Sequence, residues 1–319
     1  MKALVVADGS LSVEERPTPE PVADQVLVEV AGAGVNRADL LQVKGGYPAP
    51  AGWPSDVPGL EFSGVVVARG SGCRWTGDGD RVFGIAGGGA HATHLLVPES
   101  LCARVPEGID PVIAGGIPEV FVTAFDALVT QAHLMPGERV LIHGVGSGVG
   151  TAAVQIVRAI GATSVGTART PGKLDRAREL GLDDGVEASD DMAAAIGEVD
   201  VVLDLVGGDY LSVDTSVCRT RGRILIVGLL AGANAHLDMG TMLRKRLTLQ
   251  GTVLRSRPEH EKAAAMAGFA RSVVPLLAEG RLHPVTDCVV PLDSAAEAYE
   301  ILRSNSTFGK VVLSTGIGS

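Results

Sequence analysis

A glycine-rich turn at His143–Gly150 is the segment whose residue types most directly suggest chemistry. It follows the apolar run Val140–His143 and precedes the small residues Thr151–Ala153. Glycines let the backbone turn sharply against a pyrophosphate, whose charge is met by N–H groups at the start of the next helix. The spacing differs from a strict GxGxxG, so a tight turn without a ligand is the alternative. The residues predicted to bind a dinucleotide here are His143, Gly144, Gly146, Ser147, Gly148, Val149 and Gly150.

The residues about 20 positions past this turn predict which dinucleotide is bound. NAD-binding folds place an acidic residue there, which bonds the ribose 2′-hydroxyl. The corresponding segment, Ala168-Arg169-Thr170, has no acidic residue, and Lys173 follows it. Cations at this place bond a 2′-phosphate, so Arg169 and Lys173 predict a preference for NADPH over NADH. The alternative is that both cations are solvated charges at a helix start.

The elements around the turn alternate between strand and helix. From about residue 118 the strand patterns are separated by helical spacing, as in Thr151–Ile160 and Gly172–Leu180. This order is typical of an α/β fold with a parallel, doubly wound sheet. The predicted strands are Val140–His143, Thr163–Thr167, Val201–Asp204 and Arg223–Val227.

The first 117 residues have a different pattern, with short predicted strands and no regular alternation with helices. Short β-branched runs, such as Gln25–Val30, Gly64–Val67 and Arg81–Ile85, are punctuated by glycine and proline. This spacing predicts a small irregular β-barrel or sandwich. The chain length of 319 residues also favours two domains.

Composition and charge argue against several classes of protein. A net charge of −10 and 3% aromatic residues disfavour a nucleic-acid partner. The longest apolar stretch, Ile224–Ala231, is too short to span a bilayer, and Met1–Val6 lacks the apolar core of a signal peptide. The four cysteines show no paired spacing. We therefore expect a cytoplasmic enzyme without a membrane partner.

The chain resembles the zinc-independent quinone oxidoreductases of the medium-chain dehydrogenase/reductase superfamily. Within this zeta-crystallin-like group it is most similar to the tumour-suppressor-inducible branch. The resemblance runs from residue 34 to residue 310 and rests on the combination of its motifs. The matching segments are Gly34–Leu40, Gly46–Pro48, Pro58–Glu61, Ile117–Glu119, Leu141–His143 with Ser147–Gly150, Asp204 with Gly207 and Gly208, Leu254–Arg257, and Gly309–Lys310.

The resemblance implies a domain order and an activity. We expect a GroES-like catalytic domain over residues 1–119, a Rossmann domain over 120–257, and a return to the catalytic domain over 258–319. Members of the family bind NADPH and reduce quinones or activated alkenes by hydride transfer. They assemble as dimers or tetramers, and Arg246–Val253 reads as an edge strand that would join two copies in a homodimer.

The catalytic zinc of the superfamily's alcohol dehydrogenases is not expected here. Asn36 and Arg37 follow Val35 where a thiol ligand would stand, and Leu60 replaces a histidine ligand. Donors to the substrate oxygen would then replace the metal, and Asn36 and Tyr47 are the candidates. Tyr47 is also a candidate cofactor contact, beside the nicotinamide and its ribose. Asn36 is alternatively a helix cap, and Tyr47 a packed turn residue. Arg255 either borders the entrance of the substrate pocket or is a solvated surface charge.

Further cofactor contacts are implied by the family's motifs. Thr123 resembles the threonine that faces the nicotinamide, and Ala188 replaces a tyrosine that stacks near the adenine in part of the family. The remaining contacts expected from the resemblance are Gly207, Gly208, Gly228, Leu229, Val253, Leu254 and Asn305.

Two other functions stay open. An alkenal, enone or enoyl-thioester reductase would use the same geometry on a polarised C=C bond. A non-catalytic NADPH-binding sensor or structural protein belongs to a different class, and the retained Asn36, Tyr47 and Thr123 argue against it.

Overall fold

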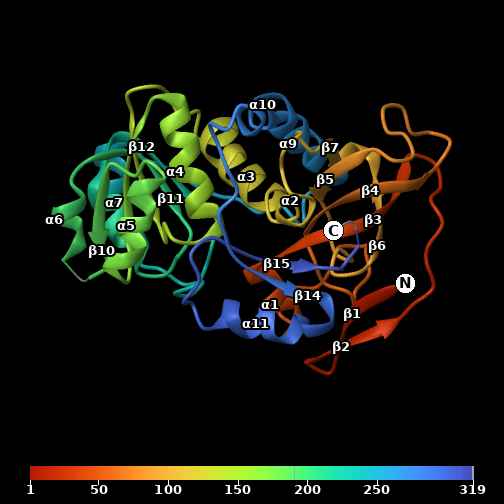
Figure 1. Cartoon of the computed structure of the whole chain (residues 1–319). Coiled ribbons are helices and arrows are strands. Elements are labelled where there is room, and N and C mark those ends of the chain that lie inside the picture. The colour runs from red at the N-terminus through yellow and green to blue at the C-terminus, as the bar shows by residue number, and fades with distance from the viewer. Residues whose placement is uncertain (190, 318–319) are drawn as a thin grey trace. The chain divides into compact units, whose positions relative to one another are not determined.

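The computed structural model describes residues 1–189 and 191–317, and the chain forms two compact units (Figure 1). Unit 1 comprises Met1–Val122 and Leu254–Ser319, and unit 2 comprises Thr123–Val253. Residues 120–122 and 254–257, which the sequence assigns to the Rossmann domain, group with unit 1. Within the described residues, no helix has both the length and the apolar character needed to cross a membrane.

Unit 1 is built on a seven-stranded sheet with the order β14-β15-β3-β4-β5-β7, and β6 pairs with β3. All pairs are antiparallel except β14 with β15. A separate antiparallel hairpin, β1–β2, opens the chain. The strands are β1 (Lys2–Ala7), β2 (Ser10–Glu15), β3 (Gln25–Val35), β4 (Glu61–Arg69), β5 (Arg81–Ile85), β6 (His94–Pro98), β7 (Cys102–Arg104), β14 (Thr286–Pro291) and β15 (Lys310–Ser314).

Helices cover this sheet because each presents an apolar side to it. Figure 1 shows α11 beside β14 and β15, where Tyr299 and Leu302 pack with Val311 and Leu313 in one buried cluster. The helices of unit 1 are α1 (Arg37–Val43), α2 (Pro111–Ala114), α3 (Pro118–Phe125, whose last three residues belong to unit 2), α9 (Glu259–Ser272), α10 (Val274–Ala278) and α11 (Ala295–Arg303). Short 3-10 segments cover Glu99–Leu101 and Leu292–Ser294, and a π-helical segment, Asp126–Gln131, continues α3.

Unit 2 is a six-stranded sheet of parallel strands with the order β10-β9-β8-β11-β12-β13. Counted along the chain this is 3-2-1-4-5-6, the order of the dinucleotide-binding fold, so the predicted doubly wound sheet is confirmed. The strands are β8 (Arg139–His143), β9 (Thr163–Ala168), β10 (Asp184–Glu187), β11 (Val199–Asp204), β12 (Cys218–Ile226) and β13 (Thr248–Gly251). The helices are α4 (Gly148–Ile160), α5 (Pro171–Glu179), α6 (Met192–Ile196), α7 (Tyr210–Val217) and α8 (Met239–Lys245).

The ends of α4 follow from two residues. Ser147 caps the helix start, since its side chain accepts a hydrogen bond from the Gly150 N–H at 3.0 Å. Gly161 ends the helix with a φ of +85°, which glycine adopts without strain.

The four strands that the sequence predicts between residues 140 and 227 are present in unit 2. The short polar strand β10 was not predicted from the sequence.

Candidate functional site

The unit 2 sheet has a topological switch point between β8 and β11. The chain order reverses between these two neighbouring strands, since β9 and β10 lie on one side and β12 and β13 on the other. Ligands of open α/β sheets bind outside the strand ends at such a switch point. The glycine-rich turn follows β8, and the segment 205–208 follows β11, so both border this point.

The glycine-rich turn is tight and packs closely on the start of α4. Gly144 has a φ of +67°, and the Val145 N–H donates to the Thr167 carbonyl at 3.0 Å. A Cβ on Gly150 would lie 2.6 Å from the Gly144 oxygen, so this position requires glycine. The arrangement brings the start of α4, with Gly146, Gly148 and Val149, to the sheet edge, where the N–H groups of a helix start can bind an anion such as a pyrophosphate.

Asp204 fixes the backbone that follows β11. It is fully buried, and its Oδ1 accepts from the Val206 N–H at 2.7 Å and the Gly207 N–H at 2.9 Å. Gly207 and Gly208 then take positive φ values of +70° and +61°. Asp204 Oδ2 is buried without a hydrogen-bond partner among the described residues. A buried carboxylate oxygen without a hydrogen-bond partner is energetically costly. A ligand hydroxyl at this edge could donate a hydrogen bond to Asp204 Oδ2 and remove that cost.

His143 stays a predicted cofactor contact, and its side chain is fully buried. Its Nδ1 lies 2.8 Å from Thr167 Oγ1, and its Nε2 lies 2.8 Å from Asp214 Oδ1. Burial raises the pKa of Asp214 to about 6 against the opposing effect of His143. With both ring nitrogens engaged, His143 joins β8 to β9 and α7, and only its backbone is left for a cofactor contact.

Arg169 and Lys173 lie where the carboxyl edge of the sheet meets α5. Arg169 directly follows β9 and is exposed, and Lys173 lies in the first turn of α5. The segment 168–173 contains no acidic residue. A 2′-phosphate at this end of β9 would meet cations and no carboxylate from the segment.

The other predicted cofactor contacts are dispersed over both units. Gly228 packs tightly on the backbone of Leu205, since a Cβ there would lie 2.3 Å from the Leu205 oxygen. The side chains of Leu229 and Val253 are exposed. Leu254 is buried in unit 1, at the point where the chain returns to it. Thr123 is part of α3, and Asn305, in the turn after α11, accepts a hydrogen bond from Arg37.

In unit 1, Asn36 stands at the N-cap of α1, and Asp39 Oδ2 accepts from its backbone N–H at 2.7 Å. The two Asn36 amide hydrogens are directed at the Gly34 carbonyl, 3.2 Å away, and at Glu61 Oε1, 3.1 Å away. A substrate oxygen would have to replace one of these acceptors. Asn36 as a donor to substrate therefore stays a prediction, and its cap position is observed.

A buried ion pair, Lys310 with Glu61, fixes the Asn36 side chain by hydrogen bonds. Lys310 Nζ lies 2.6 Å from Glu61 Oε1 and donates to Asn36 Oδ1 at 2.7 Å and to the Val35 carbonyl at 3.0 Å. Lys310 is 5% exposed and Glu61 is 0% exposed. The sequence analysis did not single out either residue, although each is a charge that opens an apolar strand, which is the available signal.

Tyr47 lies in the loop of residues 44–60, which joins α1 to β4. Burial, followed by the charge of Glu119, raises the pKa of Tyr47, while Arg255 opposes this shift. The phenol therefore keeps its proton near neutral pH. Tyr47 is partly exposed, so its hydroxyl can serve as a hydrogen-bond donor to a ligand.

Glu119 lies in the first turn of α3 and contacts the buried ion pair through Glu61. Its backbone N–H donates to Glu61 Oε2 at 2.9 Å. Burial, followed by the neighbouring Glu61 carboxylate, raises the pKa of Glu119 to about 8. A neutral carboxyl at pH 7 is thus placed among Glu61, Tyr47 and Arg255, and the sequence analysis did not identify it as a site residue.

The donor set of unit 1 does not fit zinc. Asn36 and Leu60 occupy the places of the superfamily's ligands, and His91 is a core residue whose Nδ1 lies 3.0 Å from the Tyr299 hydroxyl. Burial lowers the pKa of His91. Among residues 1–189 and 191–317, no three His, Cys, Asp or Glu side chains form a group that could hold a metal ion.

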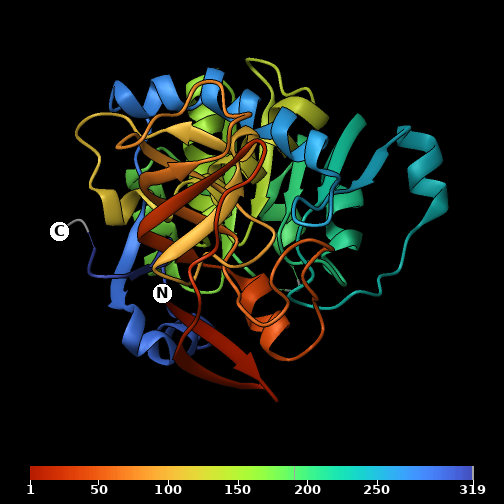
Figure 2. The same ribbon diagram turned by 90° about the vertical axis from the view of Figure 1, so that its right-hand side faces the viewer.

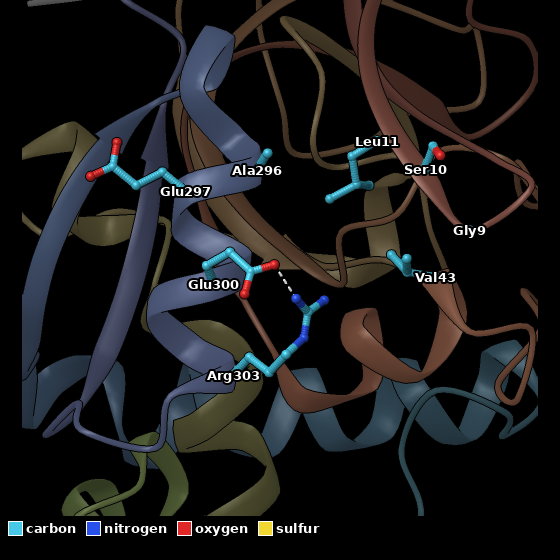
Figure 3. A pocket seen from close by; sticks show the side chains of 8 residues that line it. All are labelled: Gly9, Ser10, Leu11, Val43, Ala296, Glu297, Glu300 and Arg303. Atoms are coloured by element: carbon cyan, nitrogen blue, oxygen red, sulfur yellow. Dashed lines mark hydrogen bonds and ion pairs between the residues drawn. The ribbon is translucent and has the colours of Figure 1, made fainter.

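A pocket elsewhere in unit 1 is drawn in Figure 3. It has a volume of about 460 Å³ and lies between the β1–β2 hairpin and α11, with Val43 at one side. Its carboxylate Glu300 is paired with Arg303. None of the predicted site residues lines this pocket.

The sequence matches two domain families. Residues 22–107 match the alcohol dehydrogenase GroES-like domain, and residues 148–270 match the zinc-binding dehydrogenase domain. The second name refers to the family, because the ligands for zinc are not present in this chain at the expected positions.

Three known proteins illustrate the similarity. Quinone oxidoreductase of Sus scrofa is 31% identical over 312 residues, which cover 92% of this chain and 90% of that protein. Polyketide synthase GfsB of Streptomyces halstedii is 34% identical over 293 residues, but this chain spans only 5% of its length. The crystal structure of Escherichia coli quinone oxidoreductase, complexed with NADPH, has a TM-score of 0.86 at 24% identity, covering 98% of this chain and 100% of that one. The chain belongs to the quinone oxidoreductase family of the medium-chain dehydrogenase/reductase superfamily, and it is an oxidoreductase.

Proposed function

We propose that this protein is an NADPH-dependent quinone reductase that works without a metal. The observation that carries the proposal is the match to a quinone oxidoreductase over nine-tenths of both chains. NADPH bound at the carboxyl edge of the unit 2 sheet supplies a hydride from nicotinamide C4. The Tyr47 phenol of unit 1 donates a hydrogen bond to the substrate oxygen as negative charge develops there.

A C=C reductase is the second candidate. It is favoured by the 34% identity to a segment of a polyketide synthase, and the same donors would polarise the carbonyl of an enal, enone or enoyl thioester. Both candidates need the same hydride donor, so the identity of the substrate distinguishes them.

The experiment is steady-state NADPH oxidation with an ortho-quinone, an enal and an enoyl thioester in parallel. We expect the largest kcat/KM with the quinone. A larger value for either alkene would support the second candidate. Turnover of none of these compounds would contradict both candidates and favour a non-catalytic NADPH-binding protein.

The preference for NADPH depends on the cations after β9. Charge-assisted hydrogen bonds contribute roughly 1.5–3 kcal/mol each. We therefore expect Arg169→Ala and Lys173→Ala to narrow the ratio of kcat/KM for NADPH over NADH by roughly tenfold or more. Arg221→Ala, in the first half of β12 at the opposite sheet edge, is the control. Equal use of NADH by the wild type would contradict the assignment.

Activity should not depend on zinc, since its ligands are replaced in unit 1. We expect turnover to be unchanged after dialysis against a strong chelator, and elemental analysis to find no stoichiometric zinc. One equivalent of tightly bound zinc together with chelator-sensitive turnover would disprove this.

We further propose a homodimer formed along β13. This strand lies at the end of the unit 2 sheet, and the adjacent α8 has no buried residue. Figure 2 shows α8 and the loop before it, in blue-green, extending from unit 2. Met239 is 62% exposed and Leu243 is 75% exposed, and an open edge beside apolar side chains favours pairing with a second copy.

Sedimentation at micromolar concentration tests this assembly. We expect a two-chain particle for the wild type and a single chain for Leu243→Glu. Val22→Glu, at a similarly exposed apolar position in unit 1, should remain a dimer. A monomeric wild type would refute the proposal.

A further inference from the structure

The loop of residues 44–60, here called the aromatic loop, carries Tyr47 and Trp53 and has no helix or strand of its own. It therefore lacks the backbone hydrogen-bond ladders that fix regular elements. Both of its large aromatic side chains are contacted by cations from one segment, residues 254–262, which is the part of unit 1 that follows the return of the chain.

Arg255 makes the first of these contacts. Its side chain is buried, at 3% exposure, which rules out the solvated charge considered from the sequence. Its guanidinium lies 5.0 Å from the centre of the Tyr47 ring, and its Nη1 donates to the Tyr47 carbonyl at 3.0 Å. One side chain thus holds both the ring and the backbone of the same residue.

The remaining donors of Arg255 connect the aromatic loop to its surroundings. Nε donates to the Gly87 carbonyl at 2.8 Å, and Nη2 donates to Gln42 Oε1 at 2.6 Å. Gln42, in α1, in turn donates to the Ser55 carbonyl at 3.1 Å, farther along the aromatic loop. These three acceptors are reached from three different nitrogens of the planar guanidinium, whereas a lysine would have to reach all of them from one nitrogen.

Lys262 makes the second contact. Its Nζ lies 5.4 Å from the centre of the Trp53 ring, and the side chain is 4% exposed within α9. Gly87 also packs closely against the Trp53 ring, since a Cβ at this position would lie only 2.6 Å from Trp53 Cδ1. The indole is therefore confined by Lys262 and by the segment that also accepts from Arg255.

We propose that Arg255 is a positioning residue that sets the place of Tyr47 through the aromatic loop, and that Lys262 does the same for Trp53. The consequence for catalysis rests on the proposed role of Tyr47 as a donor to substrate. Loss of the Arg255 contacts releases the Tyr47 backbone and ring together. Substrate binding then weakens, whereas NADPH binding is retained because its predicted glycine turn and cations lie in unit 2.

The kinetic test compares Arg255→Met and Arg255→Lys with the wild type. We expect Arg255→Met to raise the KM for the quinone at least tenfold with the Kd for NADPH changed by less than twofold. Arg255→Lys keeps the positive charge over Tyr47 but loses the planar guanidinium. Its KM for the quinone should therefore lie between the values of the wild type and Arg255→Met. Arg271→Met, at an exposed position of α9, is the matched control. Wild-type KM values in folded Arg255→Met would overturn the proposal.

A spectroscopic test works even if a variant loses activity or the wild type turns over no quinone. The chain has two tryptophans, so Trp75→Phe leaves Trp53 as the only indole. In that background we expect Lys262→Met and Arg255→Lys each to shift the Trp53 emission maximum, while Arg271→Met does not. Unchanged emission in both variants would refute the proposed positioning of the aromatic loop by Arg255 and Lys262. Failure of the whole substrate panel with shifted emission would refute the proposed function alone.

Discussion

Lys310→Met should lower the free energy of unfolding of unit 1 by about 3–5 kcal/mol. Lys310 Nζ is the cation beside Glu61 Oε1 at 2.6 Å, and it also satisfies Asn36 Oδ1 and the Val35 carbonyl. Methionine matches the length of the stem but leaves the Glu61 carboxylate buried without a counter-ion. Removing one partner of a buried pair costs far more than the pair itself contributes.

Urea unfolding followed by tryptophan emission measures this loss, because Trp53 and Trp75, the only tryptophans in the chain, both lie in unit 1. Lys2→Met is the matched control, since Lys2 pairs with Asp293 at 3.0 Å on the surface, at 48% and 64% exposure. It should cost less than about 1 kcal/mol. Lys310→Met combined with Glu61→Gln removes the unpaired charge and should recover at least half of the loss. Equal effects of Lys310→Met and Lys2→Met would contradict this reading of the pair.

The elements that carry the predicted cofactor contacts were accessible from the sequence because their signals are local. The glycine turn, the strand before it and the helix after it lie within about 20 residues, and periodicity identifies each. The strand β13 lies at the sheet edge, as its local pattern indicates. The strand β10 was missed because Asp184–Glu187 is short and carries two acids.

The substrate half was not accessible in the same way, because its contacts join residues far apart in the chain. Lys310 bonds to Asn36 across 274 positions, and Arg255 bonds to Gln42 across 213. The first pair exists because β15 pairs with β3, and the second because the chain returns to unit 1 at Leu254. A lone arginine after a strand looks the same in sequence whether it is solvated or buried, so the burial of Arg255 required the structure.

The choice between two roles for Asn36 shows the same limit. The sequence allows a helix cap or a donor to substrate, and the residue type favours both. The structure places Asn36 at the cap position and directs its amide hydrogens at Gly34 and Glu61. Tyr47 is then the stronger candidate for the donor, because its hydroxyl has no hydrogen bond among the described residues.

Glu119→Gln should make unit 1 more stable than the wild type at alkaline pH. The folded protein holds the pKa of Glu119 at about 8, whereas the usual value is 4.5. Between these two values the folded state binds a proton that the unfolded state has lost. The wild type therefore loses stability as the pH rises through this window, by up to about 1.4 kcal/mol for each pH unit. Glutamine keeps the size of the side chain and cannot ionise, so the variant lacks this loss.

Unfolding of the wild type and Glu119→Gln by urea, from pH 5 to pH 9, measures the difference. We expect the two proteins to be close in stability at pH 5 and to differ by roughly 2–4 kcal/mol at pH 9, with the variant the more stable. Glu20→Gln, at an exposed position before β3, controls for the loss of one acidic side chain and should follow the wild type. Parallel curves for the wild type and Glu119→Gln would mean that Glu119 is already ionised at neutral pH. A neutral Glu119 is what allows a carboxyl group to lie beside the buried Glu61 without repelling it, because only one of the two then carries a charge.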